Sequence, residues 1–247
     1  MELVLSGQLI SYQTINPQSS KVCLILHGWG HSSSLWVSLA SQLFPGYRYL
    51  ILDLPGFGNT PLLSGNPSIP EYSHIILEFI NKLKINNPLV IGHSFGGQIV
   101  AFLAITHPHL FKQIFLISPA IIRDKSLKEK IKILLYSQFK ILKLLLPKQF
   151  LVYILSFVST SDYAHASPAH QVILKNIVNY HLKSRLKKIN SPTHIIWGDR
   201  DREISYTGKM LESLIPSSRL HVLYGVGHNP HLSHPKELST LINRYLA

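Results

Sequence analysis

The central motif of this chain is Leu89-Val90-Ile91-Gly92-His93-Ser94-Phe95-Gly96-Gly97-Gln98. Its apolar start predicts a buried strand that ends in Gly-x-Ser-x-Gly, and an apolar helix is expected to begin near Gly97. This context is typical of a nucleophile elbow, in which a serine hydroxyl stands at the head of a helix. Gly92 and Gly96 remove Cβ atoms that would collide in so tight a turn. Ser94 is therefore predicted to be a catalytic nucleophile, and the simpler alternative is a helix N-cap.

Length and composition indicate one α/β domain with an insertion. The chain has 247 residues, of which 46% are hydrophobic and 15% charged, which suits a globular enzyme and excludes a disordered chain. Its single cysteine, Cys23, rules out an internal disulfide and is interpreted as a core residue. The net charge of +12 could suit nucleic acid, anionic lipid or an acidic partner. Because no nucleic-acid motif accompanies that charge, a basic surface that keeps the protein soluble is favoured.

Neither a signal peptide nor a membrane span is expected. The first five residues lack the basic start and long apolar segment of a signal peptide, which predicts a cytoplasmic protein. The most apolar region, residues 141–158, is interrupted by Lys143, Pro147 and Lys148. No uninterrupted run of about 20 apolar residues remains to cross a bilayer, so no transmembrane helix is predicted.

Strand and helix patterns alternate along most of the chain. The expected strands are residues 3–15 (as a hairpin), 21–26, 47–52, the run from residue 89 into the Gly-x-Ser-x-Gly turn, 113–117, 193–197 and 220–224. The expected helices are residues 33–43, 69–85, 97–105, 206–215 and 235–245. Such alternation implies a parallel sheet with helices on both faces. His27, Asp53, Ser94 and Ser118 all follow predicted strands, at the sheet edge where ligands bind in such folds. We therefore expect their loops to meet at one crevice.

The alternation stops between residues 120 and 189. Apolar residues share one helical face from residue 127 to residue 146, and further helices are predicted over residues 150–158 and 169–180. We interpret residues 120–189 as a helical cap inserted over the crevice of a core made of residues 1–119 and 190–247. The lysines beside the first cap helix are either a solvated face or a docking surface for an acidic partner or an anionic surface. They are Lys125, Lys128, Lys132, Lys140 and Lys143.

A reactive serine needs an imidazole to take its proton and a carboxylate to orient that imidazole. Among 14 histidines, His228 is favoured because it follows the strand predicted at residues 220–224. His231 and His234 are the lower-ranked alternatives. Asp199 and Asp201 both follow the strand predicted at residues 193–197. Asp201 is preferred, and the resulting order Ser, Asp, His along the chain is the one this kind of elbow accompanies.

A tetrahedral intermediate also needs hydrogen-bond donors for its oxyanion, and each donor contributes roughly 10²- to 10³-fold in rate. The backbone N–H of Phe95 is one expected donor, since it follows the nucleophile at a helix N-terminus. The second donor is expected in the loop His27-Gly28-Trp29-Gly30, at the backbone N–H of Trp29.

Together these residues resemble the α/β-hydrolase superfamily from end to end. The matching segments are His27-Gly28-Trp29-Gly30, Asp53-Leu54-Pro55-Gly56-Phe57-Gly58, Gly92-His93-Ser94-Phe95-Gly96-Gly97, Gly198 to Asp201 and Gly227-His228-Asn229-Pro230. The resemblance implies an α/β-hydrolase fold, with a mostly parallel sheet of about eight strands and a helical cap. It favours Asp201, because the acid of the family ends a Gly-x-x-Asp sequence. Two residues depart from the family pattern, Ser205 in place of a proline and Ser233 in place of a glutamate.

The expected activity is hydrolysis of carboxylic esters with small to medium acyl groups. A serine at the elbow disfavours haloalkane and epoxide chemistry, for which relatives carry a carboxylate there. Apolar residues near the crevice are expected to line the substrate pocket, namely Trp29, Phe57, Phe95, Leu135 and Phe139. No metal and no organic cofactor are expected, because this chemistry requires neither and the histidines lack a ligand-like spacing.

Three alternatives remain open. The first is hydrolysis of a carbon–carbon bond in a ring-cleavage product, for which Arg123 or Arg185 could bind the substrate carboxylate. The second is an esterase for acyl groups on an acidic carrier protein, docked at the cap lysines. The third is a ligand-binding receptor on a hydrolase scaffold with little or no turnover.

Overall fold

The structure, a computed structural model, describes residues 1–122 and 167–246. Its strands are β1 (Glu2–Leu5), β2 (Gln8–Ile15), β3 (Val22–Leu26), β4 (Arg48–Leu52), β5 (Leu89–His93), β6 (Gln113–Ile117), β7 (Thr193–Gly198) and β8 (Ser218–Leu223). Its α-helices are α1 (Val37–Ala40), α2 (Ile69–Lys82), α3 (Phe95–Thr106), α7 (Pro168–Val178), α8 (Gly208–Leu214), α9 (Pro230–Ser233) and α10 (Pro235–Asn243). Two 3-10 helices are η1 (Ser33–Trp36) and η2 (Lys183–Lys188).

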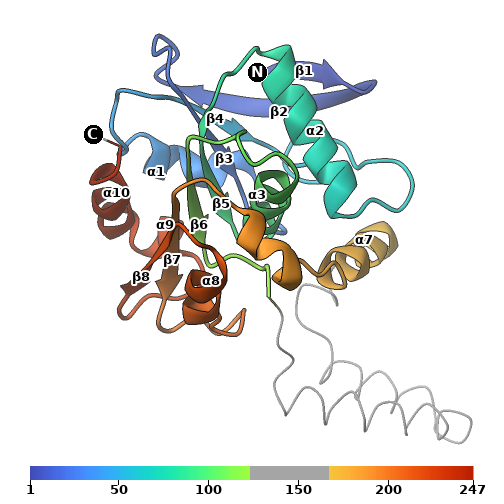
Figure 1. Ribbon diagram of the computed structural model, residues 1–247. Coiled ribbons are helices and arrows are strands. Elements are labelled where there is room, and N and C mark those ends of the chain that lie inside the picture. The colour runs from blue at the N-terminus through green and yellow to red at the C-terminus, as the bar shows by residue number, and fades with distance from the viewer. Residues whose placement is uncertain (123–166, 247) are drawn as a thin grey trace, which may run out of the picture.

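The strands form one sheet in the order β1-β2-β4-β3-β5-β6-β7-β8 (Figure 1). The β1–β2 and β2–β4 pairs are antiparallel, and each of the remaining pairs from β4 to β8 is parallel. The predicted hairpin at the N-terminus and the predicted mostly parallel sheet are both confirmed. Within this order β5 lies between β3 and β6, so the elbow that follows β5 lies near the middle of the sheet.

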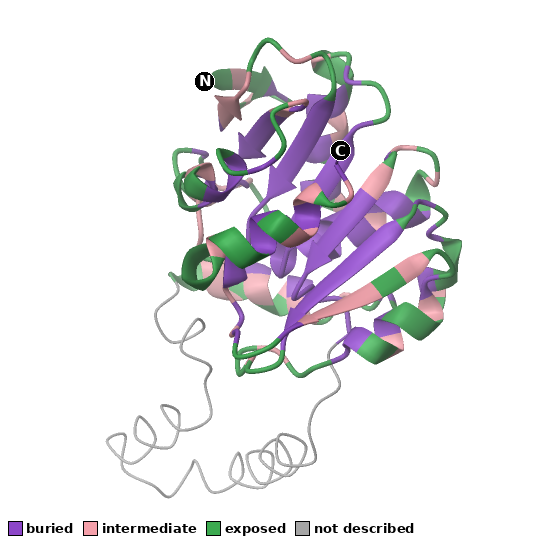
Figure 2. Cartoon of the chain, turned by 90° about the vertical axis from the view of Figure 1, so that its left-hand side faces the viewer, coloured by how far each residue is buried: buried purple, intermediate pink, exposed green. Residues whose placement is uncertain are grey.

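Helices cover both faces of the sheet, and the central strands β3 and β5 are therefore buried throughout (Figure 2). Successive side chains of a strand point to opposite faces, so Leu24 joins the core on one side of β3 and Ile25 joins the core on the other. Helices α2, α3, α7, α8 and η2 pack on the Leu24 side, and η1, α1 and α10 pack on the Ile25 side. This double burial accounts for the continuous apolar runs of the sequence.

The helices predicted over residues 33–43 and 69–85 both end earlier than expected. The helix predicted over residues 33–43 is a 3-10 turn followed by one α-helical turn that ends at Ala40. Pro45 follows closely and disfavours a helical conformation at the residue before it. Helix α2 ends at Lys82 instead of residue 85, since Lys84 takes a left-handed conformation with φ of 51°. Helix α3, in contrast, begins at Phe95, two residues earlier than predicted, directly after the elbow serine.

The described end of the predicted cap packs on the core. Helix α7 inserts Ile173 and Ile177 into the core on the α3 side of the sheet. The amide group of Gln98 in α3 donates hydrogen bonds to the carbonyl oxygens of Ile177 and Tyr180, at 3.1 and 3.0 Å. The first predicted cap helix, its lysines, Arg123 and the helix predicted over residues 150–158 lie outside the described residues. The domain boundaries at residues 120 and 189 stay a prediction.

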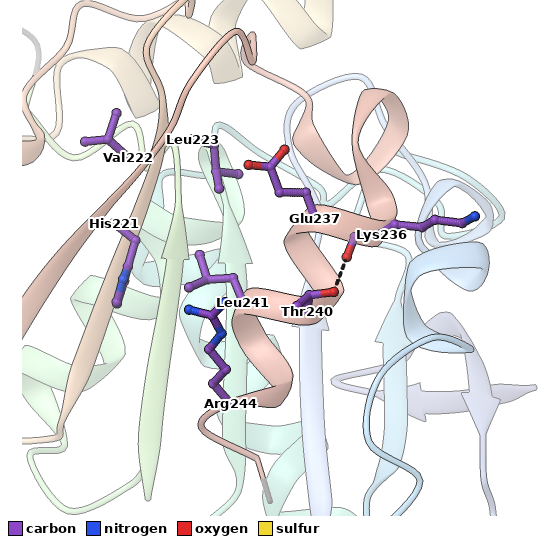
Figure 3. Close-up of a pocket in the computed structure, with 8 residues that line it drawn as sticks. All are labelled: His221, Val222, Leu223, Lys236, Glu237, Thr240, Leu241 and Arg244. Atoms are coloured by element: carbon purple, nitrogen blue, oxygen red, sulfur yellow. Dashed lines mark hydrogen bonds between the residues drawn. The ribbon is translucent and has the colours of Figure 1, made fainter.

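A surface groove of about 460 Å³ lies between β8 and α10 (Figure 3). Its lining residues are His221, Val222, Leu223, Lys236, Glu237, Thr240, Leu241 and Arg244. None of them belongs to the predicted catalytic or substrate-binding set. Separately, no helix within residues 1–122 and 167–246 is long and apolar enough to cross a membrane.

Candidate active site

Ser94 occupies a strained turn between β5 and α3. Its φ of 49° and ψ of −109° lie outside the regions that a residue with a side chain normally adopts. Backbone hydrogen bonds fix this conformation: the Ser94 amide donates to the carbonyl of Ile117 at 3.0 Å, and the Ser94 carbonyl accepts from the amide of Ala120 at 3.0 Å. Strain of this kind persists only where the surrounding structure imposes it, and it is frequent at active sites.

Glycines make the turn at Ser94 possible, as predicted. A Cβ atom on Gly92 would lie 2.8 Å from Cγ2 of Val100 and 2.9 Å from the carbonyl oxygen of Gly96. A Cβ atom on Gly96 would collide with the backbone carbonyl of Leu26 in the neighbouring strand. A larger residue at position 92 or 96 would push α3 away from the sheet. This confirms the prediction that Gly92 and Gly96 avoid a collision of Cβ atoms in the turn.

The imidazole of His228 is paired with the carboxylate of Asp201. The Nδ1 atom of His228 lies 2.7 Å from Oδ2 of Asp201, and both side chains are buried. The other carboxylate oxygen, Oδ1, accepts hydrogen bonds from the amides of Glu203 and Ile204 at 3.0 and 3.1 Å. Burial alone would raise the pKa of Asp201, but the hydrogen bond from His228 and these two amides hold the pKa below its usual value. Asp201 is therefore a fixed anion at neutral pH.

Asp199 lies nearby but performs a different task. It is exposed, and its Oδ1 accepts a hydrogen bond from the amide of Gly225 at 2.6 Å. This bond ties the loop after β7 to the turn after β8. Of the two aspartates that the sequence offers, the structure therefore brings Asp201, and not Asp199, to His228.

His228 reaches the elbow through its backbone and through its ring. The Nε2 atom of His93, the residue before Ser94, donates a hydrogen bond to the carbonyl oxygen of His228 at 2.9 Å. The imidazole rings of His93 and His228 are 4.9 Å apart, centre to centre. These contacts join the loop after β8 to the end of β5. They bring the side chain of His228 to the residue adjacent to the predicted nucleophile.

The two alternative histidines take other places. His231 is buried and stacks on the indole of Trp36, with ring centres 4.1 Å apart and planes inclined by 9°. His234 is exposed, and its Nδ1 lies 2.9 Å from the hydroxyl of Ser233. Both were expected to enter the last helix, but His231 lies in the separate short helix α9, and His234 precedes α10. Pro235 at the start of α10 separates the two helices.

The loop that contains Trp29 packs against the elbow. The carbonyl oxygen of His27 accepts a hydrogen bond from the amide of Gly96 at 3.1 Å. A Cβ atom on Gly28 would lie only 3.4 Å from Cβ of Ser94, so this loop passes directly beside the nucleophile position. The loop is itself held by Nε2 of His27, which accepts from the amide of Leu54 at 3.0 Å. An oxyanion hole formed by the amides of Trp29 and Phe95 remains a proposal.

Aromatic side chains gather around this loop. The indole of Trp29 contacts the rings of Phe57 and Phe95 edge to face, at 4.9 and 5.9 Å between centres. Phe95 is almost completely buried and also packs against Tyr72, at 4.9 Å. The other two predicted pocket residues, Leu135 and Phe139, lie outside the described residues.

Two residues near the site escaped sequence reasoning. His170 of α7 contacts the rings of Trp29 and Phe57, at 5.9 and 5.5 Å between centres, and its Nε2 lies 3.0 Å from the carbonyl oxygen of Gly56. Glu203 is exposed, and its Oε2 lies 3.9 Å from Nε2 of His228. No sequence motif distinguishes either residue, because both reach the site only through the packing of separate segments of the chain.

A third feature was also missed. Within the described residues, one group of side chains could hold a metal ion, and it consists of His31, His93 and His231. Their positions in the sequence show no ligand-like spacing, which is the reason the sequence predicted no metal site.

Known proteins resemble this chain over nearly its full length. A sequence profile described as "Alpha/beta hydrolase family" matches residues 23–241. Mouse monoacylglycerol lipase ABHD6 is 27% identical over 261 residues, which cover 91% of this chain and 75% of the lipase. The biotin biosynthesis bifunctional protein BioHC of Teredinibacter turnerae is 25% identical over 272 residues and 95% of this chain. The chain spans less than half of that bifunctional protein, 46% of its length.

Similarity in three dimensions is also extensive. The crystal structure of a membrane phospholipase A superposes with a TM-score of 0.78 and 22% sequence identity, over all of this chain and 84% of the phospholipase. At this identity the similarity establishes the fold alone.

Proposed function

The chain belongs to the α/β-hydrolase family, and we propose that it is a serine carboxylic ester hydrolase. Ser94 is the nucleophile, His228 the general base and Asp201 the carboxylate that orients the base. The observation that carries this proposal is the 2.7 Å contact between His228 Nδ1 and Asp201 Oδ2. Nδ1 donates its proton to the carboxylate, so Nε2 of the neutral ring is free of a proton and can accept one from a hydroxyl.

In the proposed reaction, Ser94 Oγ attacks the ester carbonyl as its proton moves to Nε2 of His228. The negative charge that develops on the carbonyl oxygen is stabilised by the backbone N–H groups of Trp29 and Phe95. The bond to the alcohol oxygen then breaks, and His228 returns the proton to the departing alcohol. A water molecule attacks the acyl-enzyme by the same route, which releases the acid and restores Ser94.

The substrate class is supported by the similar proteins and by the side chains near Ser94. The name of mouse monoacylglycerol lipase ABHD6 indicates an ester substrate, and 91% of this chain aligns with that protein. Trp29 and Phe57 are partly exposed; Trp29 belongs to the loop next to Ser94, and Phe57 contacts its ring. An apolar surface at this point favours an ester with an apolar acyl group over a highly charged substrate.

A serine-directed fluorophosphonate label tests the proposal. We expect one label per chain in the unaltered protein, none in Ser94→Ala, and competition by nitrophenyl esters of graded acyl length. A panel of dienoate substrates separates ester hydrolysis from carbon–carbon bond cleavage. Acyl-enzyme that accumulates without turnover would favour the receptor alternative instead. Full labelling of Ser94→Ala would refute the assignment of the nucleophile.

A further inference from the structure

Three imidazoles from distant parts of the chain meet at the residue that precedes Ser94. His31 follows β3, His93 ends β5, and His231 lies in α9. One ring nitrogen from each histidine can be chosen so that all three nitrogens lie within 4.8 Å of one another. The ring centres are 5.7 Å apart for His31 and His93, 5.4 Å for His31 and His231, and 4.9 Å for His93 and His231. The proposed mechanism uses none of these three side chains.

The tautomer of His93 leaves one of its ring nitrogens with an unused lone pair. Its Nε2 donates to the carbonyl oxygen of His228 at 2.9 Å, so in the neutral ring Nδ1 carries no proton. This Nδ1 is buried and has no hydrogen-bond partner in the part of the chain that the structure describes. Metal-bound histidines characteristically donate their second ring N–H to a backbone carbonyl or a carboxylate. His93 already has that arrangement.

The ring of His231, like that of His93, is buried with at least one nitrogen atom that makes no hydrogen bond to a described residue. Both of its ring nitrogens are buried without a hydrogen bond to any described residue, although such burial of a polar group is costly. The ring itself is held by stacking on Trp36 at 4.1 Å. His231 therefore has a fixed orientation and an unused lone pair, the two properties that a side chain needs in order to bind a metal ion without rearrangement.

The electrostatics of the cluster favour neutral rings at His93 and His231. Burial is the main reason that the pKa values of His93 and His231 are lowered, the second to about 3, and the neighbouring imidazoles lower them further. Neutral imidazole is the form that binds Zn²⁺, Cu²⁺ and Ni²⁺. Ring nitrogens around a tetrahedral zinc lie about 3.4 Å apart, given Zn–N bonds of about 2.05 Å, so each ring would move by no more than about 1 Å.

We propose that His31, His93 and His231 form a binding site for one divalent transition-metal ion of the zinc class, at the residue that precedes Ser94. His31 is half-buried, whereas His93 and His231 are buried, so His31 is the most accessible of the three ligands. The three neutral ligands leave a fourth position for water or an anion. This site is separate from the residues to which the hydrolase reaction is assigned.

Direct titration tests the site without any substrate. The full chain, freed of metal with a chelator, is titrated with Zn²⁺ by calorimetry and with Co²⁺ by visible absorption. We expect one ion per chain and Co²⁺ bands typical of a four-coordinate site. His231→Phe keeps the stacking on Trp36 and removes both ring nitrogens. It should weaken metal binding at least about tenfold, because removal of even a residue that only supports a metal ligand typically costs that much affinity.

Two control variants carry the same substitution at other histidines. His234→Phe alters an exposed histidine three residues away, and His221→Phe disrupts the imidazole pair of His194 and His221, whose nitrogens are 3.1 Å apart. Both controls should bind as the unaltered protein does. His31→Ala, at a half-buried loop position, repeats the test if His231→Phe does not fold. Absence of binding by the unaltered protein, or equal loss in a control, would overturn the proposal.

Discussion

His228 and Asp201 are joined by a 2.7 Å contact between Nδ1 and Oδ2, although 27 residues separate them along the chain. Asp199 is only two residues from Asp201, yet it bonds the amide of Gly225 at the surface instead. The loop after β7 thus directs one carboxylate to the imidazole and the other to a neighbouring turn.

Substitution of the two aspartates should separate their tasks. Asp201→Asn is expected to lower kcat by about 10⁴-fold, because an amide cannot hold the imidazole in the required tautomer or stabilise its protonated form. Asp199→Asn should change kcat by less than about tenfold. Steady-state kinetics with a nitrophenyl ester measure both. A greater loss for Asp199→Asn would mean that the acid is wrongly assigned.

Substitutions of Ser94 test both its role as the nucleophile and the strain of its backbone. Ser94→Ala and Ser94→Gly should both abolish ester turnover. Ser94→Gly should in addition be more stable than Ser94→Ala by about 1 kcal/mol, since glycine adopts a φ of 49° without the clash of a Cβ atom. Urea unfolding of the two inactive variants gives this difference directly, and equal stabilities would argue against stored strain at the elbow.

Gly96 tests the close approach of α3 to the sheet. In Gly96→Ala the new Cβ would meet the carbonyl of Leu26, so the expected loss is about 3 kcal/mol of unfolding free energy, the upper end for overpacking. Gly227→Ala is the matched control, because its nearest obstacle is the carbonyl oxygen of Arg200 at 4.0 Å. Thermal unfolding of both variants measures the contrast. A stable Gly96→Ala protein would show that α3 can shift at no cost.

Acid should destabilise the protein through its buried histidines. The pKa values of His27 and His231 are lowered from 6.5 to about 4 and about 3, mainly by burial. The unfolded chain therefore binds more protons than the folded chain below pH 6.5, so stability is complete above that pH and falls as the pH decreases. At pH 5 each such histidine should cost about 2 kcal/mol, from about 1.36 kcal/mol for each of about 1.5 pH units.

Variants assign this pH dependence to its source. Denaturant unfolding at pH 7 and pH 5 should show a smaller acid loss for His231→Phe than for the unaltered protein. His234→Phe removes an exposed histidine and should keep the full loss. If both variants lose as much stability as the unaltered protein between these two pH values, buried His231 is not one of the groups responsible.

A bound dication should also inhibit the proposed reaction. The rings of His93 and His228 are 4.9 Å apart, so a positive charge on the proposed metal site would oppose protonation of the general base. Zn²⁺ is expected to lower kcat for a nitrophenyl ester in the unaltered protein, and His231→Phe should require at least about ten times more Zn²⁺. Equal inhibition of both proteins would place the inhibitory ion elsewhere.

Local features were decided by the sequence alone. The apolar run of residues 89–91, the Gly-x-Ser-x-Gly turn and the following helix are encoded by neighbouring residues, because strand burial and turn sterics act over a few positions. The alternation of such strands and helices along the chain in turn predicts the parallel sheet. The resemblance to a known superfamily added the preference for Asp201.

Tertiary structure decided the relationships between distant residues. The pairing of His228 with Asp201, the surface role of Asp199 and the contact of His170 with Trp29 all depend on how loops and helices pack around the sheet. The cluster of His31, His93 and His231 could not be predicted, since its members are up to 200 residues apart and no local pattern joins them. Burial and three-dimensional proximity set their chemistry, and these are properties of the folded chain alone.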